Sequence, residues 1–167
     1  MVTGHRPKQL VGDYNPKNEL RVKIYNRMKN QVEAIKNQKL DISLISGMAL
    51  GIDQDFAQIA LDLRVPLLAY IPFIGQERRW NIEAQKTYLH LLQQADEILV
   101  CSDGEYTAQK MQIRNERMIQ DADHMIAVLK SSTSFGGTWN CVNAGKLKKS
   151  MKLHIIDPDK EKLNLNS

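Results

Sequence analysis

The sequence predicts an α/β protein with a three-layer, Rossmann-like, doubly wound fold around a mainly parallel sheet. Short apolar segments alternate with longer segments of helical periodicity along the 167 residues. The apolar segments are continuous, which is typical of strands buried on both faces, and strands separated by helices form parallel sheets. Right-handed crossovers then place helices on both faces of the sheet.

Six strands and five helices are expected. The first helix has the clearest pattern, because Leu20, Ile24, Met28, Val32 and Ile35 recur at steps of three or four. The first strand is short, since only Met1 to Thr3 precede Gly4, so either this strand is unusually short or the natural chain begins upstream. The strands are predicted at residues 1–3, 41–47, 66–73, 97–102, 124–130 and 152–157, and the helices at about 17–37, 52–63, 81–95, 108–121 and 138–148.

Length and composition indicate one globular domain. We expect a single domain over residues 1–157 and a frayed C-terminal tail over 158–167. With 43% hydrophobic and 25% charged residues, the chain resembles neither a disordered nor a fibrous protein. No apolar run approaches the ~20 residues of a membrane helix, and no leader is recognised. The two cysteines cannot form a disulfide framework. We therefore expect a cytoplasmic protein without a membrane partner.

The net charge of +4 is unevenly distributed. Seven basic and two acidic residues lie between Lys17 and Lys39. Such a segment could follow a nucleic-acid backbone, although the solvated face of a surface helix is the preferred interpretation.

Glycine, polar and aromatic residues gather where the predicted strands end. In an open parallel sheet, ligands bind at the carboxyl ends of the strands, near helix N-termini. The loops at the other ends of the strands lack this combination of glycine, polar and aromatic residues. This asymmetry predicts a binding pocket at the carboxyl ends. The five strand-end loops are TGHRP (3–7), SGMALGID (46–53), PFIGQERRW (72–80), SDGEYT (102–107) and SSTSFGGT (131–138).

Two glycine pairs precede predicted helices. Gly47 and Gly51 flank one turn, and Gly136 and Gly137 precede Thr138 at another. Exposed N–H groups at such turns can cradle a phosphate or carboxylate, although a plain tight turn is the alternative. Neither segment matches GxGxxG or GxxxxGK[ST], so a standard dinucleotide site or P-loop is not indicated.

Several side chains in these loops could contact a ligand or have structural roles. Arg6 offers a fork for phosphate and His5 a titratable nitrogen, or both belong to a structural loop. Asp53 could accept a ribose hydroxyl or complement the helix dipole. Trp80 and Tyr106 could stack on a base or pack. Arg114, beside Asn115, needs an anionic partner from the protein or a ligand.

Neither a metal site nor a catalytic nucleophile is recognised. The histidines lack HExxH spacing, no cysteine has a CxxC partner, and no GxSxG motif occurs. We expect no metal and no cofactor.

Five blocks, in order and spacing, resemble the YpsA-like family of the SLOG superfamily, which also contains the DNA-processing protein DprA and the LOG phosphoribohydrolases. The blocks are TGHRP (3–7), SGMALGID (46–53), IPFIGQERRW (71–80), YTAQKMQIRNERM (106–118) and FGGT (135–138). The resemblance implies a Rossmann-like fold with a nucleotide-type pocket. It points to these residues: Gly4, His5, Arg6, Ser46, Gly47, Gly51, Asp53, Gln76, Trp80, Tyr106, Arg114, Asn115, Gly136, Gly137 and Thr138.

One departure bears on activity. The LOG branch resembles PGGxGTxEE, whereas Asn140 stands here two positions after Thr138 and cannot act as a carboxylate base. We therefore expect a sensor or sequestering protein, encoded by a phage or mobile element and homo-oligomeric. Its ligand would be a nucleoside phosphate, an ADP-ribose-like molecule or a cyclic nucleotide signal.

Two other functions remain open. The first is N-glycoside hydrolysis or ribosyl transfer, with Asp53 as the candidate catalytic carboxylate and Glu105 as the second choice. The second is DprA-like nucleic-acid binding.

Overall fold

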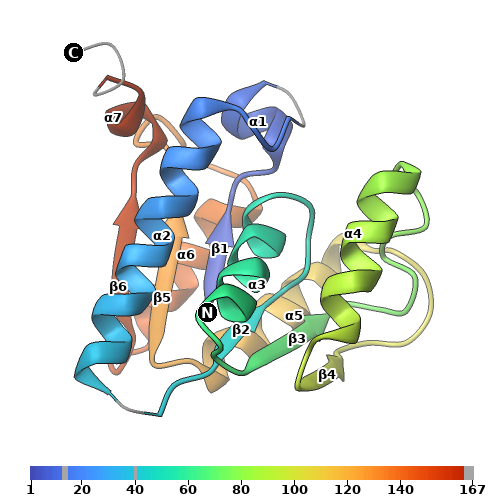
Figure 1. Cartoon of the computed structure of the whole chain (residues 1–167). Helices are drawn as coiled ribbons and strands as arrows, with labels where there is room; N and C mark the ends of the chain where they lie inside the picture. The colour runs from blue at the N-terminus through green and yellow to red at the C-terminus, as the bar shows by residue number, and fades with distance from the viewer. Residues whose placement is uncertain (13–14, 40, 164–167) are drawn as a thin grey trace.

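The computed structural model describes residues 1–12, 15–39 and 41–163 (Figure 1). Strands and helices alternate along most of the chain, as the sequence predicts. The strands are β1 (Val2–Gly4), β2 (Leu44–Ser46), β3 (Leu67–Ile71), β4 (Glu97–Val100), β5 (His124–Val128) and β6 (Lys152–Ile156). The helices are α1 (Pro7–Val11), α2 (Glu19–Gln38), α3 (Ile52–Asp62), α4 (Ile82–Gln93), α5 (Ala108–Asp121), α6 (Gly137–Leu147) and α7 (Pro158–Leu163).

All strand pairs are parallel. Hydrogen bonds join β1, β5 and β6 in one ladder and β2, β3 and β4 in another. Helix α3 packs on both β1 and β2, each of which is the end strand of its ladder. The strands β2 to β4 lie on one side of β1, whereas β5 and β6 lie on the other (Figure 1). The chain therefore reverses its direction of winding at β1, where ligands bind in many doubly wound folds.

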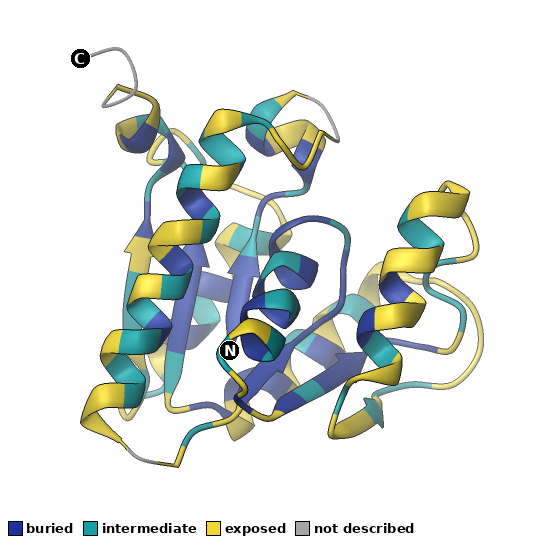
Figure 2. Ribbon diagram, in the orientation of Figure 1, coloured by how far each residue is buried: buried dark blue, intermediate teal, exposed yellow. Residues whose placement is uncertain are grey.

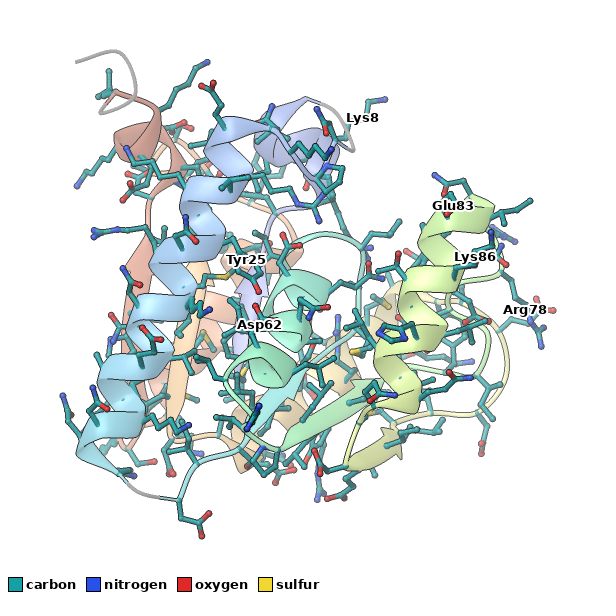
Figure 3. All side chains as sticks on the ribbon, in the orientation of Figure 1. Lys8, Tyr25, Asp62, Arg78, Glu83 and Lys86 are labelled. Carbon is teal, nitrogen blue, oxygen red and sulfur yellow. The ribbon has the colours of Figure 1, made fainter. Side chains whose placement is uncertain are left out.

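Helices cover both faces of the strands and make the fold three-layered. Helices α2, α3 and α4 lie in front in Figure 1, and α5 and α6 lie behind. Within the front layer, the Tyr25 hydroxyl of α2 donates to Asp62 Oδ2 of α3 at 2.6 Å, and the two side chains point toward one another in Figure 3. The Rossmann-like α/β prediction is confirmed.

The strands separate two apolar clusters. Neighbouring residues of β5 alternate between them, because Ile126 and Val128 belong to the cluster under α2 and α3, whereas Met125 and Ala127 belong to the other. This is the arrangement expected for strands covered on both faces, and Figure 2 shows β1 and most of β5 buried.

Strand β4 differs from the prediction of burial on both faces. Ile98 is 48% exposed and Val100 is 40% exposed. Among the described strands, β4 pairs only with β3, so it is an edge strand. Its apolar sequence does not distinguish an edge from a central position.

Two short helices were not expected. Helix α1 begins at Pro7 and ends before Gly12, whose φ is 86°. Helix α7 occupies most of the segment predicted to be a frayed tail, and its Glu161 is buried. Residues 164–167 of that segment lie outside the described residues.

The basic segment between Lys17 and Lys39 is largely paired within the protein. Arg21 binds Asp55, and both Lys23 and Arg27 bind Glu161. Lys29 and Lys39 also lie within ion-pair distance of Asp62 and Asp123. Most of this charge therefore stabilises contacts of α2 with other elements. No helix in the described part of the chain has the length and hydropathy to cross a membrane.

Candidate functional site

A cleft of about 650 Å³ opens beside the carboxyl ends of β1, β3 and β4. It is lined by Arg6, by most of the loop 73–80, by residues 102–106 and by Met111 of α5. Loops after three parallel strands therefore form one concave surface, as the strand-end composition predicts. Its volume falls in the ~300–1,000 Å³ range of small-molecule pockets.

Five charged side chains line this cleft. They are Arg6, Arg78, Arg79, Asp103 and Glu105. Within the described ranges, none of these side chains makes a hydrogen bond or an ion pair. Figure 3 shows Arg78 projecting from the loop beside α4. The three guanidinium groups are free to bind an anion, and the two carboxylates are free to accept hydrogen bonds.

Aromatic rings form part of the cleft wall. Trp80 packs edge-on against Tyr88, with ring centroids 5.4 Å apart. Tyr106 packs edge-on against Phe73 at 6.2 Å and is 60% exposed. Trp80, Tyr106 and Phe73 all line the cleft, so their remaining ring surface can stack on a planar ligand.

One buried polar atom of the cleft has no partner in the described chain. This atom is Oγ of Ser102, and Ser102 lines the cleft. The Gln76 side chain, in contrast, hydrogen-bonds to Tyr88. Buried polar atoms are normally hydrogen-bonded, so Ser102 marks the cleft wall as a place where a ligand can supply the missing bond.

Arg114 and Asp53 do not line the cleft, but they form an ion pair. Arg114 Nη1 donates to Asp53 Oδ2 at 3.0 Å, and both residues are buried. The expectation that Arg114 needs an anionic partner is confirmed, and the partner is a protein carboxylate. The role of Asp53 as a catalytic or ribose-binding carboxylate is not favoured by this placement, because one of its oxygens is already shared between Arg114 and the N–H of Ala49.

Gly47 leaves room for this ion pair. A Cβ atom at residue 47 would stand 1.1 Å from Arg114 Nη1. The guanidinium group therefore occupies the space that any other side chain would fill. Its Nε has no partner in the described chain.

The loop from Ser46 to Asp53 uses several polar groups internally. Ser46 Oγ donates to the Asp53 carbonyl at 2.6 Å and accepts from the Met48 N–H at 3.1 Å. The Ala49 N–H donates to the Asp53 carboxylate. These amide groups are consequently not available to a phosphate, so the expected anion cradle is in part a self-contained turn.

Gly4 and Gly51 bring the first two strand-end loops together. A Cβ at Gly4 would lie 2.6 Å from Ile52, and a Cβ at Gly51 would lie 2.7 Å from Pro7. Gly51 also has a φ of 91° where α3 begins. Both glycines therefore have a packing role next to Arg6, rather than a contact with the cleft.

His5 joins the loops after β1 and β5. Its Nε2 lies 3.2 Å from the Lys130 N–H, from which it accepts, and 3.3 Å from Thr133 Oγ1. Burial and the neighbouring Lys130 charge lower the pKa of His5 below 6.5. A neutral, internally bonded imidazole fits the structural alternative for this residue.

The remaining predicted site residues lie apart from the cleft. Gly136 and Gly137 are exposed, and a Cβ at either position would meet no atom within 4 Å. Thr138 and Asn115 are half-buried, and neither lines the cleft. The structure thus brings together four of the predicted residues, Arg6, Gln76, Trp80 and Tyr106, in one cleft.

Four further polar residues of the cleft were not singled out from the sequence. Arg78 and Arg79 stand in the predicted loop 72–80, and Ser102 and Asp103 stand in the loop 102–107. Two adjacent arginines in a predicted strand-end loop could have indicated these positions of the cleft from the sequence alone.

The described residues contain neither a cluster of three metal-ligating side chains nor an activated thiol. In the part of the chain that the structure describes, no group of three or more His, Cys, Asp or Glu side chains could hold a metal ion. Burial raises the pKa of both the Cys101 and the Cys141 thiol. A protonated thiol is a poor nucleophile.

Comparison with known proteins gives a consistent family match. The family model YpsA, described as the YspA SLOG family, matches residues 1–161. The chain is 29% identical over 146 residues to the uncharacterized SPbeta prophage-derived protein YoqJ of Bacillus subtilis, covering 78% of this chain and 84% of that protein. A UPF0398 protein of Brevibacillus brevis is 30% identical over 102 residues, covering 58% of this chain and 53% of its own. A UPF0398 protein of Bacillus thuringiensis is 25% identical over 133 residues, covering 76% and 71%.

Proposed function

Since the chain belongs to the YpsA family of SLOG proteins, we propose that it binds a nucleotide-derived small molecule in the cleft beside β1, β3 and β4. The ligand class comprises nucleoside phosphates, ADP-ribose-like molecules and cyclic nucleotide signals. One observation carries the proposal: three arginines without a partner among the described residues, together with three aromatic rings, surround a single cleft at the carboxyl ends of parallel strands.

Each part of such a ligand has a chemical counterpart in the cleft. Arg6, Arg78 and Arg79 neutralise phosphate groups, because a guanidinium fork matches phosphate oxygens. The Trp80 and Tyr106 rings stack on a base. Asp103 and Glu105 accept hydrogen bonds from ribose hydroxyls, as acidic residues do in nucleotide sites.

Calorimetric titration with a panel of nucleoside monophosphates, ADP-ribose species and cyclic nucleotides tests the proposal. At least one panel member should bind with micromolar affinity. Arg6→Ala should weaken that binding about tenfold or more, since a charge-assisted hydrogen bond contributes about 1.5–3 kcal/mol.

Lys8→Ala is the matched control for Arg6→Ala. Lys8 is an exposed cation two residues further along, in α1, and does not line the cleft (Figure 3). Its removal should leave the affinity unchanged. Equal weakening by the two variants, or no heat from any panel member, would contradict the proposal.

Binding without turnover describes a sensor or a sequestering protein. Asn140 supports this role, because it stands where the LOG motif has an acidic residue. The prophage-derived description of YoqJ supports a phage or mobile-element origin. A cytoplasmic location and a homo-oligomeric state belong to the same proposal.

N-glycoside hydrolysis is the second candidate function, favoured by the two free carboxylates in the cleft. Asp53 is paired with Arg114, so Glu105 or Asp103 would stabilise an oxocarbenium-like transition state. Liquid chromatography of a bound nucleotide should then show free base, and Glu105→Gln or Asp103→Asn should abolish its release. Recovery of the intact nucleotide after prolonged incubation would exclude that substrate.

DprA-like nucleic-acid binding has less support. Most basic side chains of α2 are already paired with carboxylates of the protein. An electrophoretic shift of single-stranded DNA that disappears at about 200 mM salt would reflect charge attraction alone.

A further inference from the structure

A second cavity, of about 490 Å³, lies between α6 and α7 on the far side of β5. We call it the α6–α7 cavity. Its lining includes Trp139, Asn143 and Lys146 of α6, Lys160 of α7 and Arg27 of α2. It shares no lining residue with the cleft beside β1, β3 and β4.

The charges around this cavity are not balanced. Glu161 is bound by Arg27 at 3.1 Å and by Lys23 at 3.6 Å. The Asp157 carboxylate accepts from the N–H groups of Ser131 and Asp159. Glu161 is therefore neutralised by its cationic partners, whereas Asp157 keeps its charge, and the four cations that line the cavity outnumber its two carboxylates.

Two lysines of the cavity remain available to an anion. The Lys146 ammonium lies 3.5 Å from Asn143 Oδ1, its one contact in the described chain. The Lys160 side chain makes no hydrogen bond or ion pair with a described residue. Lys130, in contrast, donates to the Gln9 carbonyl at 2.7 Å. The available positive charge thus comes from α6 on one wall and α7 on the other.

An aromatic ring and an apolar floor complete the cavity. Trp139 stands in the first turn of α6 and is 36% exposed. Val142 and Ile156 are buried and also line the cavity. A planar ring can lie on this apolar surface while an attached anion meets the lysines.

We propose that the α6–α7 cavity is a second ligand site, which binds a nucleoside monophosphate-type molecule through Trp139, Lys146 and Lys160. The proposal is independent of the function assigned to the cleft. A free nucleotide and a nucleotide unit of a single strand share this chemistry, so the test includes both.

The two tryptophans of the chain permit a site-resolved titration. Trp80 lines the cleft and Trp139 lines the α6–α7 cavity. In a Trp80→Phe variant, the fluorescence reports on the second cavity alone. Adenosine monophosphate should change this fluorescence saturably. Adenosine lacks the phosphate group and inorganic phosphate lacks the base. Each should therefore bind at least about tenfold more weakly than adenosine monophosphate.

Lysine variants in the Trp80→Phe background assign the anion contacts. Lys146→Ala and Lys160→Ala should each weaken binding of adenosine monophosphate about tenfold. Lys149→Ala, which removes an exposed lysine just after α6 and outside the cavity, should have no effect. All three positions are exposed, and circular dichroism melting should verify that each variant folds.

Three results would overturn the proposal. One is the absence of a saturable change at Trp139 up to millimolar adenosine monophosphate. Another is equal weakening by Lys146→Ala and Lys149→Ala. The third is a response confined to the Trp139→Phe variant, in which Trp80 is the reporter; that result would support the cleft alone. If an oligonucleotide binds more tightly than the mononucleotide, the ligand of the α6–α7 cavity is a single strand and not a free nucleotide.

Discussion

Arg114 and Asp53 form a buried ion pair that ties helix α5 to the start of helix α3. Arg114 Nη1 lies 3.0 Å from Asp53 Oδ2, and the two side chains are 6% and 10% exposed. The residues are 61 positions apart in the sequence. The pair fixes the loop between β2 and α3, because the same carboxylate also accepts from the Ala49 N–H.

Replacement of Asp53 tests this structural role. Asp53→Asn leaves the Arg114 charge buried without a counter-charge, which should lower the free energy of unfolding by about 3–5 kcal/mol. Urea unfolding measures the change. The exposed pair Glu83–Lys86, labelled in Figure 3, supplies the control. Glu83→Gln should leave the stability unchanged, and an equally small effect of Asp53→Asn would refute the structural role.

Gly47 should be intolerant of any side chain for the same reason. Gly47→Ala places a Cβ 1.1 Å from the present position of Arg114 Nη1, so the guanidinium must leave Asp53. The free energy of unfolding should fall by about 3 kcal/mol. In an Arg114→Met background the same substitution should lower the free energy of unfolding by a smaller amount, because the guanidinium group that it displaces is absent. A double-mutant cycle by urea unfolding measures this coupling, and additive effects would contradict it.

Acidification should destabilise the protein through its histidines. His124 Nδ1 and His154 Nε2 lie 3.0 Å apart in stacked rings. Burial lowers the pKa of both below 6.5, and nearby lysine charge adds to the effect. His5 shifts in the same direction. Below pH 6.5 the unfolded chain binds protons that the folded chain does not, so the stability falls as the pH falls toward the lower folded values.

Unfolding measured between about pH 7.5 and 5 tests this pH dependence. The free energy of unfolding should decrease across that window. A His154→Gln variant should show a shallower decrease, because it removes one titrating imidazole. His90→Gln is the control, since His90 is an exposed residue of α4. Identical slopes in the His154 variant and the wild type would show that the stacked pair does not control the acid response.

The exposed edge of β4 predicts self-association. Ile98 and Val100 point to one face of an edge strand and are 48% and 40% exposed. Unpaired strand edges with apolar side chains are templates for pairing. We expect a homodimer that joins two copies at β4. Ile98→Lys should shift sedimentation toward the monomer, whereas Leu147→Lys, at another exposed apolar position, should not. A wild-type protein that sediments as a monomer at high concentration would contradict the prediction.

The fold could be predicted from the sequence because periodicity reports burial directly. Leu20 to Ile35 mark one helix face, and the apolar runs around Leu67 and Ile126 mark strands. Helix α1 was missed because its five residues are too few to show a period, although Pro7 and Gly12 are ordinary start and stop signals. The exposure of β4 was missed because it depends on which strands pair, and pairing is not a local property.

The candidate site was predictable at the level of loops more than of residues. The loops 72–80 and 102–107 do line the cleft, and Arg6, Gln76, Trp80 and Tyr106 lie in it. For Arg114 and Asp53, the sequence could not tell whether the partner of each charge is a ligand or the other residue. That choice depends on a contact between residues far apart in the chain.

Amide chemical-shift mapping by NMR tests the central claim most directly. The nucleotide panel described above is added to isotope-labelled protein, and the shifted amides are located in the sequence. If the cleft is the nucleotide site, the largest shifts fall at residues 73–80 and 102–106 and next to Arg6, and in Arg6→Ala they require at least about tenfold more ligand. If every panel member leaves these amides unmoved, or shifts only amides elsewhere, the cleft is not the site of nucleotide binding.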